Sequence, residues 1–131
     1  MPSAAPFLMF QGQCEAALTH YVAAIPGAEI RELRRYGAGE PGIEGTVAMA
    51  TLVVGGLAIM ANDSPPVHAF TFTPSTSIFL TVDDEEQFDA IAAALPANGG
   101  SWMMPPGAYG FSRKFGWCAD RFGVSWQINL P

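Results

Sequence analysis

The clearest alternation of apolar and polar positions lies near the end of the chain, in residues 111–130, FSRKFGWCADRFGVSWQINL. Residues 120–123 (DRFG) predict a tight turn, in which Gly123 is free to adopt the positive φ that hairpin turns often need. After the turn, three apolar positions alternate with three polar ones: Val124, Trp126 and Ile128 with Ser125, Gln127 and Asn129. Strand side chains point alternately to opposite faces. We therefore expect one face to pack on a helix and the polar face to line a cavity.

A second pattern, with apolar residues at the helical spacing i, i+3, i+4 and i+7, occurs twice. The first stripe is Leu18, Tyr21, Val22 and Ile25, and the second is Phe88, Ile91, Ala92 and Leu95. Pro26 and Pro96 follow these stripes and end the two predicted helices. Asp83, with Glu86 three residues later, predicts a capping box at the start of the second helix.

The two helical stripes belong to a longer internal repeat. The stripes and their prolines are 70 positions apart, and the first strands match at the same offset, Leu8 and Phe10 against Ile78 and Leu80. The closing strands, residues 56–62 and 123–129, match at an offset of 67. This duplication predicts two βαβββ modules within one domain, residues 1–131. We place module one at about 5–63, a connector at about 64–75 and module two at about 76–131.

Composition and charge narrow the function classes. The net charge of −6 argues against nucleic acid and anionic membranes as partners, because both require a basic surface. The longest apolar run, residues 47–61, is too short to span a bilayer and contains Gly55-Gly56, so it predicts a buried hairpin. The first ten residues lack the basic region of a signal peptide. We expect a cytoplasmic protein in which Cys14 and Cys118 are free thiols, with a disulfide as the alternative.

Four local segments resemble a known family: PFLMFQG, HAFTFTPS, YGFSRKFGW and DRFGVSWQINL. They look like the PhnB-like, 3-demethylubiquinone methyltransferase-like branch of the vicinal oxygen chelate superfamily, which includes glyoxalase, bleomycin-resistance and dioxygenase proteins. The resemblance covers nearly the whole chain. It implies an α+β fold whose two βαβββ modules form a cup around a ligand or metal, with the helices outside the mixed sheets. It also implies a homodimer, which the apolar Phe70 and Phe72 of the connector support.

The resemblance implies metal ligands at positions that this chain fills differently. Superfamily metalloenzymes carry a His or carboxylate on the first strand of each module and a Glu on the last. The matching positions here are about Phe7 and Ser77, then Met60 and Gln127. None offers the imidazole or ionised oxygen that divalent cations prefer. We therefore expect no metal and no cofactor.

The face that remains is apolar with several amides, which is typical of a small-molecule site. Nine residues are predicted to line it: Met9, Gln11, Met60, Asn62, Ser77, Tyr109, Trp117, Gln127 and Asn129. We expect this site between the two modules, with an unknown small molecule as ligand. The alternative is that the amides bond neighbouring loops and the rings belong to the core.

Catalysis has only weak candidates in this sequence. His68 is either a general base or a structural histidine packed beside Phe70. Asp63 either reaches the rim of the site or makes a turn before Ser-Pro-Pro. Arg113, Lys114 and Arg121 either steer an anion or form ordinary surface charge. The chain is thus a binding protein or, alternatively, a lyase, isomerase or dioxygenase-type enzyme. Methyl transfer is disfavoured because no glycine-rich strand-to-helix loop is present.

Overall fold

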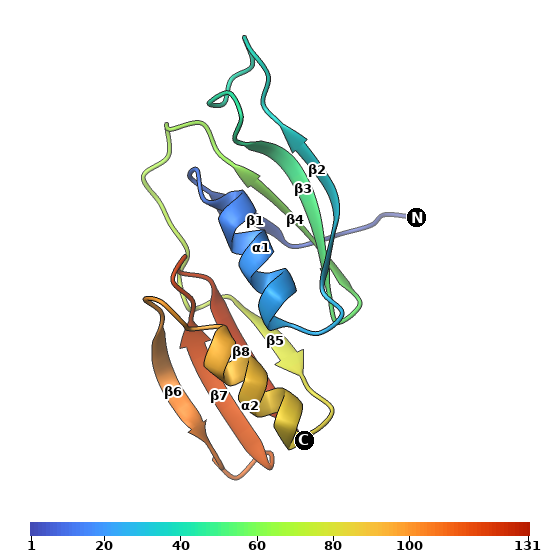
Figure 1. The fold of residues 1–131 in the computed structure, drawn as a ribbon, viewed down its shortest axis with the longest axis vertical. Coiled ribbons are helices and arrows are strands. Elements are labelled where there is room, and N and C mark those ends of the chain that lie inside the picture. The colour runs from blue at the N-terminus through green and yellow to red at the C-terminus, as the bar shows by residue number, and fades with distance from the viewer. The chain divides into compact units, whose positions relative to one another are not determined.

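The computed structural model describes residues 1–131 and divides them into two compact units, Met1–Thr71 and Phe72–Pro131. The first unit contains β1 (Phe7–Phe10), α1 (Cys14–Ala24), β2 (Glu29–Arg35), β3 (Val47–Val54) and β4 (Leu57–Asp63). The second contains β5 (Ser77–Thr81), α2 (Glu85–Ala94), β6 (Ser101–Gly107), β7 (Lys114–Ala119) and β8 (Ser125–Leu130). Both units therefore have the order βαβββ (Figure 1), which confirms the predicted α+β class and the duplication.

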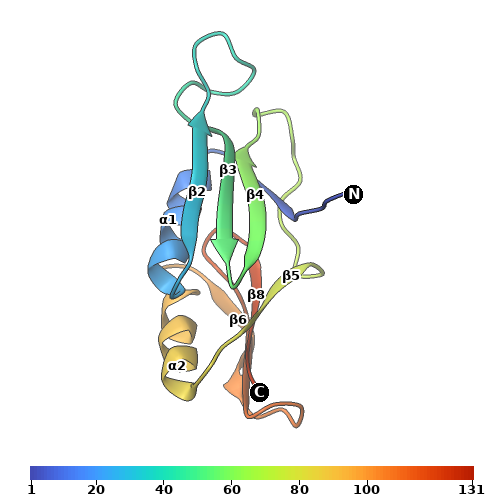
Figure 2. The same cartoon turned by 90° about the vertical axis from the view of Figure 1, so that its right-hand side faces the viewer.

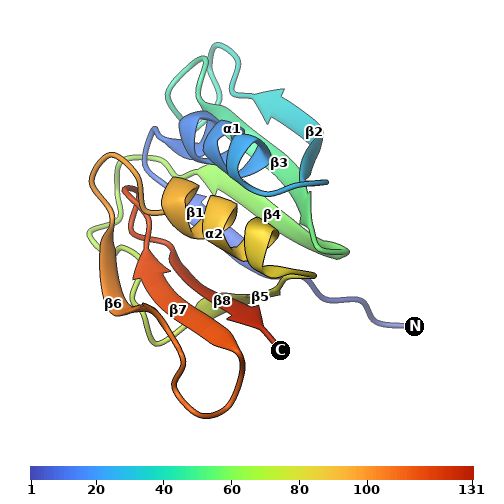
Figure 3. The ribbon, with the colours of Figure 1, turned by 60° about the horizontal axis from the view of Figure 1, so that its bottom comes forward.

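Each unit builds one mixed sheet of four strands. The strand orders are β1-β4-β3-β2 and β5-β8-β7-β6. In both sheets the first strand pairs in parallel with the last, and the other pairs are antiparallel. Figure 2 shows α1 against one face of the first sheet. Figure 1 shows α2 in front of β7 and β8 of the second sheet, and Figure 3 shows α2 to one side of these strands. No helix of the same unit covers the opposite sheet face.

The register of the first strands corrects the predicted offset. β1 places Phe7 beside Met60, whereas β5 places Phe79, and not Ser77, beside Gln127. Met60 and Gln127 are themselves equivalent at the predicted offset of 67, so the first strands match at 79 − 7 = 72 positions and not 70. A shift of two leaves every side chain on its original face, so the alternation of the sequence could not distinguish the two registers.

The helix faces agree only in part with the predicted stripes. All four residues of the second stripe, from Phe88 to Leu95, are buried, as predicted. In the first stripe Leu18, Tyr21 and Ile25 are buried, but Val22 is 38% exposed. The buried face of α1 instead extends to three small residues on its other side: Cys14, Ala17 and Ala24. Alanine and cysteine contribute little to a hydrophobic periodicity, so the pattern of large apolar residues favours Val22 over these small residues.

The two helices begin differently. The N-cap of α2 is Asp84, whose side chain accepts a hydrogen bond from the Gln87 backbone N–H at 2.8 Å. Gln87 Oε1 in turn accepts from the Asp83 N–H at 2.9 Å. The capping pair is therefore one residue later than the predicted Asp83 and Glu86. Gln13, the N-cap of α1, makes no capping hydrogen bond with its side chain, so the first N–H groups of α1 need a partner from elsewhere in the unit.

The hairpin of β7 and β8 has the predicted turn. Gly123 has φ 92° and donates its N–H to the Asp120 carbonyl at 3.0 Å. The Asp120 carboxylate is buried and accepts hydrogen bonds from three donors: the Phe122 N–H, the Val124 N–H and Trp126 Nε1. Val124, Trp126 and Ile128 are buried, which confirms the predicted apolar face.

Neither helix has the length and apolar composition needed to cross a membrane.

Candidate functional site

The candidate site of the second unit is the sheet face opposite α2, where the polar residues of β8 lie. Ser125 is buried; its Oγ accepts a hydrogen bond from Trp117 Nε1 at 2.7 Å and lies 2.6 Å from Ser77 Oγ. Gln127 is half-buried and lies between Phe79 and Trp117 in the register. The structure therefore brings the predicted Ser77, Trp117 and Gln127 onto one face.

Asn129 continues this face by two residues. It lies between Thr81 of β5 and Phe115 of β7. Its Oδ1 atom is buried and has no hydrogen-bond partner. Leaving a buried acceptor unpaired costs roughly 1–3 kcal/mol, so such atoms are uncommon in a folded core.

An aromatic cluster borders the two amides. Phe115 is buried, and its ring centroid lies 4.9 Å from that of Phe111 and 6.2 Å from those of Phe79 and Tyr109. The three outer rings remain accessible, with exposed fractions of 55% for Phe79, 41% for Tyr109 and 62% for Phe111. The Tyr109 hydroxyl donates to the Pro105 carbonyl at 2.5 Å, so Tyr109 presents a ring and not a free hydroxyl.

The sequence identified only part of this cluster. Tyr109 was predicted to line the site, and Phe79 lies on the face that alternation assigns to it. Phe115 and Trp117 are two positions apart on one strand and therefore share a face, so the alternation that predicts Trp117 on this face also predicts Phe115 there. Phe111 precedes β7 in an irregular segment, where no periodic signal exists, and only the ring contacts reveal it.

The first unit carries the equivalent face on β1, β3 and β4. Met60 lies between Phe7 and Thr51 in the register, and Asn62 pairs with Met9. Asn62 Oδ1 is buried without a hydrogen-bond partner, as is Asn129 Oδ1 67 positions later. The predicted Met9, Met60 and Asn62 therefore share one sheet face.

Gln11 and His68 lie elsewhere in the first unit, at the connector. Gln11 is exposed and follows the end of β1; its Nε2 donates to the carbonyls of His68 at 2.9 Å and Phe70 at 3.4 Å. This amide bonds a loop, which is the alternative that the sequence left open. The His68 ring stacks on Phe70, with centroids 4.9 Å apart, which corresponds to its structural interpretation.

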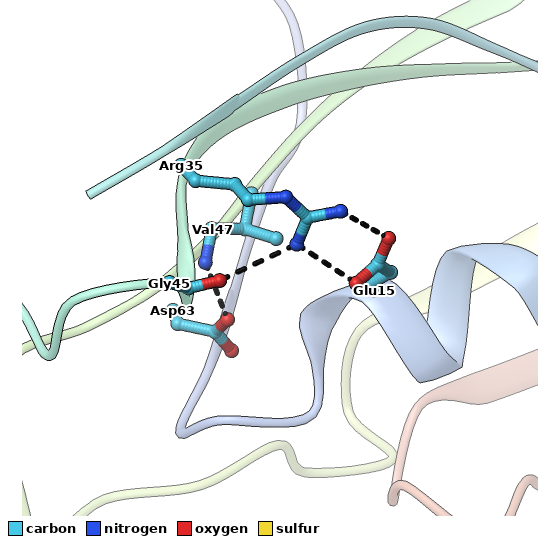
Figure 4. Close-up of polar contacts among 5 residues, drawn as sticks. All are labelled: Glu15, Arg35, Gly45, Val47 and Asp63. Atoms are coloured by element: carbon cyan, nitrogen blue, oxygen red, sulfur yellow. Dashed lines mark hydrogen bonds and ion pairs between the residues drawn. The ribbon is translucent and has the colours of Figure 1, made fainter. Parts of the chain in front are cut away.

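Asp63 is buried on the helix side of the first sheet, where its carboxylate joins the end of β4 to the start of α1 and to the start of β3. Only 2% of its surface is exposed. Its Oδ1 accepts from the N–H groups of Gly12 at 2.8 Å and Cys14 at 2.9 Å. Its Oδ2 accepts from the Val47 N–H at 2.9 Å, and Figure 4 shows this last contact. The expectation that Asp63 makes a turn or reaches the rim was wrong. It ends β4 on the opposite face from Asn62, and its partners are too distant in sequence for a local pattern to reveal them.

Each unit contains an ion pair between a helix and a strand. In the first unit, the Arg35 guanidinium binds both oxygens of Glu15, at 2.9 and 2.6 Å, and also donates to the Gly45 carbonyl (Figure 4). This hydrogen bonding lowers the pKa of Glu15. In the second unit, Lys114 binds Asp89 at 2.7 Å and Glu85 at 3.3 Å, which raises the pKa of Lys114.

The other two basic residues of the last hairpin also have partners. Arg113 Nε donates to the Pro131 carbonyl at 2.6 Å, and the Arg121 guanidinium lies 4.3 Å from the centre of the Phe122 ring. Together with the ion pairs of Lys114, these contacts favour surface charge over the anion-steering interpretation of Arg113, Lys114 and Arg121.

Both cysteines are free and buried. Burial, together with the nearby Asp63, raises the pKa of the Cys14 thiol to about 12. Burial, together with Asp120, raises the pKa of the Cys118 thiol to about 12. The nucleophilic form of cysteine is the thiolate, so neither side chain is suited to nucleophilic chemistry near neutral pH.

The donor chemistry of the two sheet faces does not fit a divalent metal. The side chains beside the last strands are Phe7 with Met60 and Phe79 with Gln127. None supplies the imidazole or carboxylate that such ions prefer. Across the chain, no group of three or more His, Cys, Asp and Glu side chains is placed to hold a metal ion.

Two βαβββ units, each with its first strand parallel to its last, define the fold of the vicinal oxygen chelate superfamily. A glyoxalase/bleomycin-resistance/dioxygenase domain from Frankia has this fold: it is 14% identical and has a TM-score of 0.70, covering 99% of this chain and 97% of its own. The 3-demethylubiquinone-9 3-methyltransferase family model matches residues 2–129, and the chain belongs to that PhnB-like family.

Two solved structures are much closer in sequence. A PhnB protein from Bacillus cereus is 42% identical with a TM-score of 0.91, and the match covers 99% of this chain and 100% of that one. A protein from Pseudomonas aeruginosa is 33% identical with a TM-score of 0.86, covering 99% and 98% of the two chains. No curated protein matches the chain.

Proposed function

We propose that this protein binds a small organic molecule against the amide-bearing faces of its sheets, without a metal or other cofactor. One observation carries the proposal: Asn62 and Asn129, at equivalent positions of the two units, both hold a buried Oδ1 atom that has no partner. Each unpaired acceptor costs roughly 1–3 kcal/mol. A ligand that donates a hydrogen bond to either atom recovers that energy on binding.

The rest of the polar groups support binding over a structural role for these amides. The Gln11 amide bonds two loop carbonyls, and the Ser125 hydroxyl bonds Trp117 and Ser77. These two groups are thus satisfied within the protein, whereas Ser64 Oγ, beyond the end of β4, is buried without a partner. The unpaired Oδ1 atoms of Asn62 and Asn129 instead lie on sheet faces that no helix of their own unit covers.

An enzyme of the same superfamily is the alternative, and the polar groups favour it less. The Asp63 carboxylate is occupied by three backbone N–H groups, and the two thiols are protonated near neutral pH. The family description names a methyltransferase. A glycine-rich loop in a doubly wound parallel sheet is the usual site for such a cofactor, and both sheets here are mixed.

We also propose that the protein is a homodimer in the cytoplasm. Val67 is 76% exposed and Phe70 62% exposed, and both belong to the connector. Exposed apolar side chains gathered in one short segment fit a surface that a partner covers. Free, buried cysteines are compatible with a reducing compartment. Light scattering at micromolar concentration should give the mass of a dimer, and a monomer alone would contradict this part of the proposal.

Thermal-shift screening with divalent metals and small organic molecules tests the binding function. We expect organic molecules, and not metals, to raise the midpoint temperature of thermal unfolding. Gln127→Leu should weaken their binding while the free energy of unfolding changes by less than about 1 kcal/mol, because no protein group loses a partner. Gln13→Leu is the matched control, since Gln13 is exposed and makes no capping hydrogen bond. A large loss of stability in Gln127→Leu with unchanged binding would contradict the proposal, as would stoichiometric metal in the purified protein.

A further inference from the structure

The amide-bearing face of the second unit also indicates the kind of molecule it accepts. Its large accessible apolar side chains are aromatic: Phe79, Tyr109 and Phe111 are each more than two-fifths exposed and surround the buried Phe115. Aromatic rings prefer offset-stacked or edge-to-face contacts with other rings, which add about 0.5–1.5 kcal/mol beyond the area buried. Such a cluster selects a flat ring over a flexible aliphatic chain.

Charge restricts the ligand further. The residues of β5, β7 and β8 that share this face by register are all uncharged: Ser77, Phe79, Thr81, Phe115, Trp117, Ala119, Ser125, Gln127 and Asn129. The adjacent Lys114 points to the helix side, where it binds Asp89 and Glu85. The whole chain carries a net charge of −6. An anion bound among these residues would therefore lose hydration without a cationic side chain from β5, β7 or β8 on the face, in a protein whose net charge repels it.

The hydrogen-bonding capacity of the face is also asymmetric. The Trp117 N–H is already donated to Ser125, and the Tyr109 hydroxyl is donated to a carbonyl. Asn129 Oδ1, beside Phe115, is instead a buried acceptor with no donor. The complementary ligand group is therefore an O–H or N–H at the edge of a ring.

We propose that this face binds a neutral, planar aromatic molecule that carries one hydroxyl or N–H donor. Its ring packs against Phe79, Tyr109 and Phe111, and its donor bonds Asn129 Oδ1. This inference rests on the proposed binding function and adds the ligand class. The first unit lacks the same specificity, because Met60 and Thr51 stand there at the positions of Gln127 and Trp117.

Three probes of the same ring system separate these features in calorimetric titrations of the full-length protein. They are 2-naphthol, naphthalene and 2-naphthoate, which provide a neutral donor, no donor and a charge. We expect 2-naphthol to bind about tenfold more tightly than naphthalene, which corresponds to one recovered buried acceptor. We expect 2-naphthoate to bind more weakly than either. Equal affinities for 2-naphthol and naphthalene, or tightest binding of 2-naphthoate, would overturn the inference.

Two variants assign the effect to residues. Asn129→Ala should abolish the preference for 2-naphthol over naphthalene, whereas Phe111→Ala should weaken both, and neither change touches the helix-facing core. Phe70→Ala, an equally exposed ring in the other unit, is the matched control and should change neither affinity. Retention of the preference in Asn129→Ala would contradict the assignment. The ranking of the probes on the unmodified chain tests the inference even where a variant does not fold.

The outcomes also separate this inference from the proposed function. A non-aromatic ligand whose binding depends on Gln127, found together with no binding of 2-naphthol, would overturn the ligand class and leave the function standing. The absence of any small-molecule ligand, with Gln127→Leu indistinguishable from the parent chain, would remove both.

Discussion

The two units share a backbone plan but hold the start of their helices by different means. In the first unit Asp63, at the end of β4, bonds the N–H of Cys14 in α1, 49 residues earlier. In the second unit Asp84 caps α2 locally, and Leu130 stands at the position of Asp63 (63 + 67 = 130), where it is buried. The same topology therefore permits either a local or a long-range polar contact, and the hydrophobic pattern does not reveal which one a module uses.

The two amide-bearing faces differ in a second way. Both carry an asparagine with a buried, unpaired oxygen, at Asn62 and Asn129. The first surrounds it with methionines, of which Met9 pairs with Asn62 directly, and the second with aromatic rings. Methionine is flexible and adapts to many shapes, whereas stacked rings favour flat partners. The second face is therefore the more selective of the two.

The largest expected effect tests the difference between the two helix starts. Asp63→Ala leaves three backbone N–H groups without their acceptor, so the free energy of unfolding should fall by about 3–5 kcal/mol. Asp84→Ala removes a single capping bond and should cost about 1 kcal/mol. Urea denaturation of both variants measures the difference. Equal losses would show that Asp63 is no more than a cap.

The two units have in common a buried, free cysteine whose thiol pKa is raised, Cys14 in the first and Cys118 in the second. With a pKa of about 12, each thiol has only about one ten-thousandth of its population as thiolate at pH 8. Alkylation by iodoacetamide in the native protein should therefore be about a thousandfold slower than in urea, for Cys14 and Cys118 alike. Rapid native labelling of either cysteine, detected by mass spectrometry, would show that its unit opens locally.

Substitution of the two asparagines should change the free energy of unfolding less than Asp63→Ala does, and in the opposite direction. Asn62→Leu and Asn129→Leu each remove an unpaired acceptor, so stability should be unchanged or higher by up to about 1 kcal/mol. This behaviour is unlike that of Asp63, whose oxygens are all used. Thermal or urea unfolding provides the measurement, and a loss of more than about 1 kcal/mol in either variant would reveal a hydrogen bond within the protein.

The smallest effects concern the exposed ion pairs, whose pH dependences have opposite signs. The pKa of Glu15 is lowered by Arg35, so this pair stabilises the fold above the unfolded pKa of Glu15 and stops doing so as the pH falls through the folded value. The pKa of Lys114 is raised by Asp89, so its contribution is present below the unfolded pKa of lysine and is lost as the pH rises through the folded value.

Variants of these pairs should flatten opposite ends of the stability profile. Glu15→Gln should reduce the loss of stability on the acid side, and Lys114→Met the loss on the alkaline side. Both effects should shrink in high salt, because exposed pairs are screened. Midpoints of urea unfolding, measured across pH at two salt concentrations, check this prediction. An effect of Glu15→Gln confined to alkaline pH would contradict the sign assigned to the pKa shift of Glu15.

Periodicity predicted those features that depend on which face a residue occupies. The buried Trp126 and Ile128, the opposite placement of Gln127 and Asn129, and the α2 stripe all follow from periods of 2.0 and 3.6. The two-residue error that made Ser77, and not Phe79, the equivalent of Phe7 arose because such a shift preserves every face. Periodicity also could not find Asp63, since its three partners are 16 to 51 residues away, or Phe111, which lies in an irregular segment.

The location of the ligand is tested most directly by the side-chain signals of the second unit in ¹⁵N-labelled protein titrated with 2-naphthol. The amide signals of Gln127 and Asn129 and the indole signal of Trp117 should shift together and saturate at one concentration, because these groups share one sheet face. The amide of Gln11, which bonds the connector of the other unit, provides an independent reporter of the connector. Shifts confined to the Gln11 amide and its connector, with Gln127, Asn129 and Trp117 unmoved at saturation, would contradict binding at this face.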